Sequence, residues 1–180
     1  MSQDGSPNTA SSALVLQRDR VPSPGDEVRL QRLWLALQRR TWQSLAVLAA
    51  SRDVPTLEAA NALARIGWWY TGRPSCVLDM RDLSLRLLEH QIRSMGAQLQ
   101  GGERVFVALR SLSENPTASP LAMAADAAVL CVQLGKTDIK SAKQTLATIG
   151  RDRFIGTILV SETGMPIAPP DPNASYAGPK

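Results

Sequence analysis

The sequence predicts an α/β fold with three layers, in which helices cover both faces of a doubly wound, mainly parallel sheet of about five strands. Apolar runs of strand length alternate along the chain with amphipathic helical stretches. Runs such as AVLCVQL and FIGTILV are apolar nearly throughout, which is typical of parallel strands buried on both faces. A length of 180 residues, with 44% hydrophobic and 20% charged residues, suits one globular domain with tails.

The expected elements follow one another in order. The first is an amphipathic helix over residues 26–42, because Leu30, Leu33, Trp34 and Leu37 recur on one helical face. Strands are expected over residues 45–50, 75–80, 104–109, 127–134 and 154–161. Further helices are expected over residues 57–66, 83–98, 119–125 and 138–149. Gly67 and Gly150 follow the last periodic residues of two of these helices and predict that the helices end there.

We expect the domain to span residues 25–162, between a flexible N-terminal segment (1–24) and a flexible, Pro-rich tail (163–180). Neither end carries enough apolar surface to offset the chain entropy lost on folding.

Composition excludes several classes of protein. No apolar run reaches the roughly 18–20 residues of a membrane span, and the N-terminus lacks the features of a signal peptide, so we expect a cytoplasmic protein. Cys76 and Cys131 lie in apolar runs and are expected to be buried free thiols. With one histidine, no metal cluster or cofactor is expected. The net charge of +4 is spread among mixed signs, so nucleic-acid binding is not expected.

The connection between the first strand and the next helix lacks the chemistry of a phosphate loop. Residues 52–56 (RDVPT) contain neither glycine nor lysine, although a strand–loop–helix unit binds nucleotide phosphates through glycine amides and a lysine. Asp53 and Glu58 add negative charge in and beside this loop. The frame of a nucleotide site is therefore expected without its phosphate-binding groups.

Three segments carry a family resemblance: residues 125–132 (ADAAVLCV), 135–137 (GKT) and 155–160 (IGTILV). With them the chain resembles the deviant P-loop ATPases of the MinD/ParA type over about residues 26–161. Within these it is most similar to the cytoplasmic domain of bacterial tyrosine kinases that control capsule and exopolysaccharide export. The resemblance implies a reduced P-loop NTPase-like fold. Because the stretch before the third strand is short, it also implies a smaller sheet, with one edge that a partner or tail covers.

Against that family pattern, the metal-binding and phosphate-binding positions are damaged. Thr56 is a remnant of the Walker-A hydroxyl, and Asp79 is the first of two expected aspartates, the second being replaced by Arg81. Ala108 stands where the Walker-B aspartate is expected. Phosphoryl transfer depends on these contacts, so we predict a pseudoenzyme without catalytic residues. Asp82 is expected to cap the helix that begins near Leu83.

Other positions indicate an interaction surface. Asp26, Arg29 and Arg32 form a D-x-x-R-x-x-R pattern, which by resemblance builds a subunit interface; a solvated charged face is the alternative. We assign Trp34 to the same surface. Trp68 and Trp69, expected in the connection after Gly67, either anchor a partner or pack under the sheet. By the same resemblance, Tyr176 in the tail is a candidate phosphate acceptor; a plain flexible tail is the favoured alternative.

The sequence thus favours a non-catalytic pseudo-ATPase or pseudo-tyrosine-kinase that regulates exopolysaccharide synthesis or export through protein–protein interaction. By resemblance, its partner is a membrane polysaccharide co-polymerase, which would recruit it to the inner membrane, or a related kinase; self-association is also expected. One alternative is an active, nucleotide-binding kinase-like ATPase. Another is a positioning factor of the MinD/ParA type that binds DNA or another protein.

Overall fold

A computed structural model describes residues 24–167, apart from the side chains of residues 24–27, 29 and 30. These residues form an α/β fold around one six-stranded sheet with the order β2-β3-β1-β4-β5-β6. The first five strands are parallel and only β6 is antiparallel. The strands are β1 (Ser44–Ala49), β2 (Ser75–Asp79), β3 (Arg104–Leu109), β4 (Ala127–Gln133), β5 (Phe154–Val160) and β6 (Pro166–Ile167). The predicted strands are confirmed to within a residue or so at each end.

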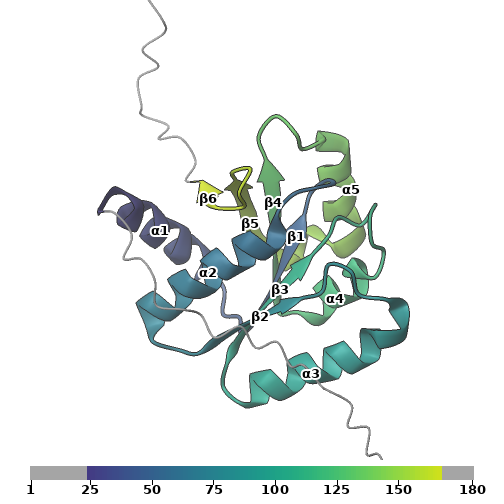
Figure 1. The fold of residues 1–180 in the computed structure, drawn as a ribbon, viewed down its shortest axis with the longest axis horizontal. Coiled ribbons are helices and arrows are strands. Elements are labelled where there is room, and N and C mark those ends of the chain that lie inside the picture. The colour runs from purple at the N-terminus through teal and green to yellow at the C-terminus, as the bar shows by residue number, and fades with distance from the viewer. Residues whose placement is uncertain (1–23, 168–180) are drawn as a thin grey trace, which may run out of the picture.

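Helices flank the sheet on both sides (Figure 1). They are α1 (Pro24–Leu37), α2 (Thr56–Thr71), α3 (Leu88–Gln100), α4 (Ala118–Ala124) and α5 (Ile139–Ile149), with short 3-10 turns η1 (Leu85–Leu87) and η2 (Arg151–Arg153). Gly150 ends α5 as predicted. The first helix is shorter than expected, because it ends at Leu37 rather than Trp42. The indole of Trp42 turns back and donates a hydrogen bond to the Leu37 carbonyl at 2.8 Å.

Two further predicted helix boundaries are wrong. Helix α2 continues through Gly67 to Thr71, and Gly72 ends it in the left-handed conformation at φ 65°. Trp68 and Trp69 therefore lie on the last turn of a helix rather than in a loop. Asp82 caps no helix, because its carboxylate binds the Arg110 guanidinium at 2.9 Å and α3 begins only at Leu88.

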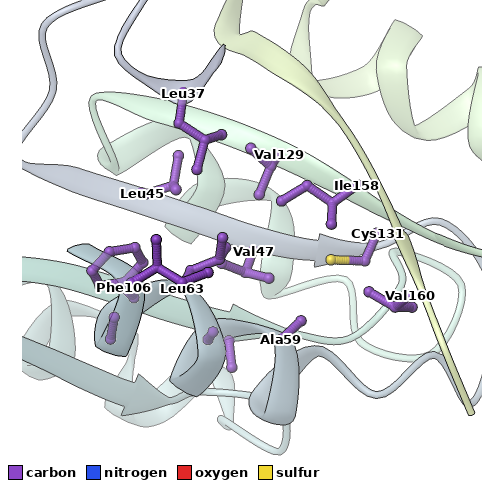
Figure 2. Packing of buried hydrophobic residues seen from close by; sticks show 14 of the residues in the cluster. Leu37, Leu45, Val47, Ala59, Leu63, Phe106, Val129, Cys131, Ile158 and Val160 are labelled. Carbon is purple, nitrogen blue, oxygen red and sulfur yellow. The ribbon is translucent and has the colours of Figure 1, made fainter. Parts of the chain in front are cut away.

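The hydrophobic core has two halves, one on each face of the sheet, because successive side chains of a strand point to opposite faces. Along β1, Leu45 and Val47 pack on the side of α1 and α2, whereas Ala46 and Leu48 pack on the side of α3, α4 and α5. Figure 2 shows the first half, where side chains of β1, β3, β4 and β5 surround Ala59 and Leu63 of α2. The buried faces on both sides explain why these strands read as unbroken apolar runs.

The sheet also reaches into the predicted tail. After β5 the chain turns at Gly164 (φ 77°), and β6 pairs with the end of β5, Leu159 with Ile167 and Val160 with Pro166. The ordered fold thus extends to Ile167, five residues past the expected boundary at residue 162, and the sheet has six strands rather than about five.

Candidate functional site

The candidate site lies at the carboxyl ends of the parallel strands. From β1 the chain crosses to β2 on one side, whereas from β3 it crosses back over β1 to β4 on the other side. Ligands of open α/β sheets bind where connections diverge in this way. Two open depressions lie here, of about 430 Å³ and about 520 Å³, and both are lined by Arg52 of the loop after β1.

The loop between β1 and α2 is held in a compact turn. The Ala50 amide donates to the Cys131 carbonyl of β4 at 2.9 Å, and Ser51 Oγ lies 3.4 Å from Thr137 Oγ1. Asp53 adopts a positive φ of 58°, which is uncommon for a residue with a side chain. The exposed side chains of this turn are Arg52 and Asp53, so it presents one charge of each sign to the depressions.

Thr56 is the first residue of α2, at the position expected for the metal-binding hydroxyl. Its side chain is fully buried, and Oγ1 donates a hydrogen bond of 3.0 Å to the Leu109 carbonyl at the end of β3. The hydroxyl therefore joins the start of α2 to the sheet. It faces the protein interior rather than the depressions.

Asp79 and Ala108, the two strand positions at which the family resemblance predicts metal-binding aspartates, lie directly opposite each other in the β2–β3 register. Ala108 is completely buried and contributes no polar group. Asp79 forms an ion pair with Arg81, Nε to Oδ1 at 2.9 Å and Nη2 to Oδ2 at 2.9 Å. This bidentate hydrogen bonding lowers the pKa of Asp79, so the carboxylate is ionised but already occupied.

A turn that the sequence did not predict packs beside the α2 start. Gly164, in the connection between β5 and β6, is buried, and a Cβ at this position would lie 2.8 Å from the Pro55 carbonyl oxygen and also meet Glu58. Next to it, Glu162 pairs with Lys136 of the loop after β4 at 3.3 Å. The turn at Gly164 therefore packs against Pro55 and Glu58, where the loop between β1 and α2 joins α2.

Sequence reasoning also missed Arg110, the residue directly after β3. Its guanidinium lies 2.9 Å from Asp82 and 3.4 Å from Glu114, and it lines the smaller depression together with Arg52 and Arg81. Hydrogen bonding to Asp82 raises the pKa of Arg110. An arginine directly after a buried strand is the signal that could have marked it, because strand ends meet at one edge of the sheet.

The predicted interface residues are separated by the structure into two groups. Asp26, Arg29 and Arg32 lie on α1, where the Arg32 side chain is exposed. Trp34, however, is only 4% exposed and belongs to the core, so the assignment of Trp34 to a contact surface is wrong. Trp68 and Trp69 are 44% and 40% exposed at the end of α2. Tyr176 lies outside the described residues.

Comparison of the sequence with protein-family models and with curated proteins returned no match. Within residues 24–167, no helix has the length and apolar character needed to cross a membrane. The same part of the chain brings no group of three or more histidine, cysteine or acidic side chains together in a metal-binding arrangement.

Proposed function

We propose that this chain is a P-loop NTPase-like pseudoenzyme that acts by binding another protein rather than by turning over nucleotide. The single observation that carries the proposal is the hydrogen bond between Thr56 and Leu109. The one hydroxyl available for Mg²⁺ at the start of α2 is buried and used to join helix and strand. A nucleotide-binding hydroxyl instead has to face the metal and the phosphates.

Two further observations support the same conclusion. The charge of the Asp79 carboxylate is balanced by the ion pair with Arg81, and the buried residue at position 108 is an alanine, which cannot bind a metal. The turn at Gly164 lies against Pro55, beside the loop that would need space for phosphate oxygens. Each of these features removes a different part of the electrostatic machinery of phosphoryl transfer.

The surface, in contrast, offers groups suited to a protein partner. Trp68 and Trp69 project from the end of α2, and tryptophan is a frequent anchor of protein interfaces. Arg32 is exposed on α1, which contacts α2. By the family resemblance, we propose that the partner is the cytoplasmic part of a membrane polysaccharide co-polymerase or a related kinase. In this function the chain regulates exopolysaccharide synthesis or export and reaches the inner membrane through its partner.

Nucleotide binding tests the first half of the proposal. Isothermal titration of the full chain with Mg-ATP and Mg-ADP is expected to give no heat of binding at micromolar affinity. Micromolar binding would overturn the pseudoenzyme assignment and favour the active kinase-like alternative.

Pull-down of the co-polymerase cytoplasmic domain tests the second half. Two double variants test the surface: Trp68→Ser/Trp69→Ser and Arg29→Glu/Arg32→Glu. We expect each of them to weaken binding of the partner at least about tenfold, because losing even one anchor side chain from an interface has an effect of this size. The matched control for the charge reversal is Arg86→Glu/Arg93→Glu, on exposed residues of η1 and α3, and Leu85→Ser controls for the loss of exposed apolar surface. If both test variants bind as well as the controls do, this surface is not the interface.

A further inference from the structure

Two exposed tryptophans lie at the end of the sheet opposite the candidate site. Helix α2 runs from the carboxyl end of β1 to the amino end of β2, so its last turn, with Trp68 and Trp69, lies beside the amino ends of the strands. Helix α1 leads into β1 and ends at the same border. The two helices lie side by side (Figure 1), since Trp34 packs against Gly67 about one turn before each helix ends.

The exposed charges nearest to the two indoles are arginines. Arg65 lies three and four residues before them, and so on the same side of α2, and Arg73 follows the helix just before β2. Both side chains are exposed, and neither forms an ion pair with another described residue. Residues 59–78 contain no acidic residue. We call the following set the aromatic–basic end: Arg39, Arg65, Trp68, Trp69 and Arg73.

Arg104, at the start of β3, links the two helix ends and reports the positive charge around them. Its Nη2 lies 3.4 Å from Oε1 of Gln38, which directly precedes the exposed Arg39 at the end of α1. Burial, followed by the positive charge of Arg73, lowers the pKa of Arg104. Arg39 and Arg73 are therefore part of one basic region rather than two separate surfaces.

Three acidic residues at this border leave that positive charge largely unopposed. Glu103 is half-buried, and its charge acts on Cys76 of β2. The Asp126 carboxylate accepts hydrogen bonds from two backbone amides at the start of β1. Asp152 lies in η2, where its carbonyl, rather than its carboxylate, accepts a hydrogen bond from the Arg40 guanidinium. The aromatic–basic end is thus suited to an anionic ligand that also takes up apolar rings.

We propose that the aromatic–basic end binds the surface of an anionic membrane. Indole rings favour the headgroup region of a bilayer, where the ring is partly buried and the N–H stays hydrated, and arginines bind the phosphates of the lipids. Proteins that bind single-stranded nucleic acid instead hold the strand in a basic groove. Trp68 and Trp69 project from a helix end, at 44% and 40% exposure, which favours a lipid surface.

This inference goes beyond the proposed function, in which a partner brings the chain to the membrane. It sets the orientation of the chain, with the amino ends of the strands toward the lipid and the two depressions at the carboxyl ends away from it. The same two tryptophans are candidate anchors for the partner, so lipid binding has to be measured without the partner.

Co-sedimentation of the full chain with lipid vesicles is the first measurement. Phosphatidylcholine vesicles that contain about 30% phosphatidylglycerol are expected to bind the chain, and pure phosphatidylcholine vesicles are not. Brominated lipid in the anionic vesicles is expected to quench tryptophan fluorescence. Trp34 and Trp42 are only 4% exposed, so the quenching reports Trp68 and Trp69. No binding to anionic vesicles, or binding without quenching, would overturn the inference.

Charge reversal tests the arginines. Arg65→Glu/Arg73→Glu is expected to weaken vesicle binding at least about tenfold, most strongly at low salt, because the attraction to the lipid is electrostatic. The matched control Arg86→Glu/Arg93→Glu makes the same change of charge on exposed residues of η1 and α3, and is expected to bind vesicles like the unmodified chain. Equal weakening by both double variants would mean that net charge alone attracts the chain, against the inference.

Two comparisons separate lipid from other ligands. Trp68→Ser/Trp69→Ser is expected to weaken vesicle binding and to abolish the quenching. Binding of mixed-sequence single-stranded DNA by the unmodified chain, without binding of anionic vesicles, would make the ligand a nucleic acid and overturn the inference. Vesicle binding without capture of the co-polymerase domain would support this inference and refute only the proposed partner, whereas the reverse result would refute this inference alone.

Discussion

The ring of Trp34 in α1 lies against the backbone of Gly67 in α2, so closely that a Cβ on residue 67 would lie 2.7 Å from Trp34 Cη2. Trp34 also packs edge-to-face on Trp42, with ring centroids 6.0 Å apart. The guanidinium carbon of Arg104 lies 5.0 Å from the centroid of each ring, within cation–π range. The contact between α1 and α2 therefore depends on a glycine just before the last turn of α2.

Gly67→Ala is expected to lower the free energy of unfolding by about 1–3 kcal/mol, although alanine is the better helix former, because the new methyl group overlaps the Trp34 ring. Urea unfolding measures the change. Gly96→Ala in α3 is the matched control, because no atom lies within 4 Å of its added Cβ. The control is expected to be neutral or to stabilise by up to about 1 kcal/mol. Equal effects of the two substitutions would contradict the tight contact.

Thr56→Val is expected to lower the free energy of unfolding by about 1–3 kcal/mol, since it keeps the shape of the side chain but leaves the buried Leu109 carbonyl without its donor. Thr56→Ser keeps the hydroxyl and is expected to cost less. The measurement is denaturant unfolding with and without Mg²⁺. A stability difference that appears only when Mg²⁺ is present would instead make Thr56 a metal ligand.

Asp126 stabilises the start of β4 in a pH-dependent way. Its Oδ2 accepts hydrogen bonds from the amides of Gln43 and Ser44 at 2.9 and 2.8 Å and from Ser44 Oγ at 2.9 Å. Partial burial acts to raise the pKa of Asp126, but these hydrogen bonds outweigh it and the pKa is lowered. A depressed folded-state pKa contributes stability above the unfolded pKa, and this contribution is lost as the pH falls through the folded value.

Asp126→Asn is therefore expected to destabilise the fold by about 1 kcal/mol at neutral pH, and the difference from the unmodified chain should shrink below about pH 4. Urea unfolding across this pH range provides the measurement. Glu89→Gln, on an exposed residue of α3, is the control and should change stability by less than about 0.5 kcal/mol. If the stability difference between Asp126→Asn and the unmodified chain grew at acid pH, the pKa of Asp126 would be raised in the folded protein rather than lowered.

The two cysteines are expected to differ in reactivity. Complete burial raises the pKa of Cys131 to about 12, so its thiol should resist an aromatic disulfide reagent in the native protein at mildly alkaline pH. Burial, followed by the charge of Glu103, also raises the pKa of Cys76, but its half-buried side chain should react slowly. Cys76→Ser and Cys131→Ser assign the two signals, and guanidinium should make both thiols react. Fast native labelling of Cys131 would mean that β4 opens locally.

Much of the fold could be predicted because the parallel strands are buried on both faces. Uninterrupted apolar runs such as residues 127–133 mark such strands directly, and their alternation with helices indicates the layered architecture. The burial of Trp34 was equally predictable from the helical period, because Trp34 lies on the apolar stripe of α1 with Leu33 and Leu37 and packs with them in the core. The spacing of apolar residues along α1 predicted the burial of Trp34 better than the neighbouring charged residues Arg29 and Arg32 predicted its exposure.

The features that could not be predicted depend on contacts between distant segments. A glycine after a periodic stretch usually marks a helix end, but α2 continues through Gly67. The glycine is needed there because the Trp34 ring packs directly against it, a contact that the sequence alone does not show. The bond from Thr56 to Leu109 joins residues that are remote in the chain. β6 has only two residues, too few for any periodic pattern. The candidate site is shaped by such long-range contacts.

The turn at Gly164 has a consequence for any attempt to engineer a phosphate loop into this chain. Glycines and a lysine placed between residues 51 and 56 would supply phosphate-binding groups, but the connection between β5 and β6 would still lie against Pro55 and Glu58. A working design would therefore have to change two segments that are about a hundred residues apart in the chain and in contact in the fold, and the effects of changes in contacting segments are not additive.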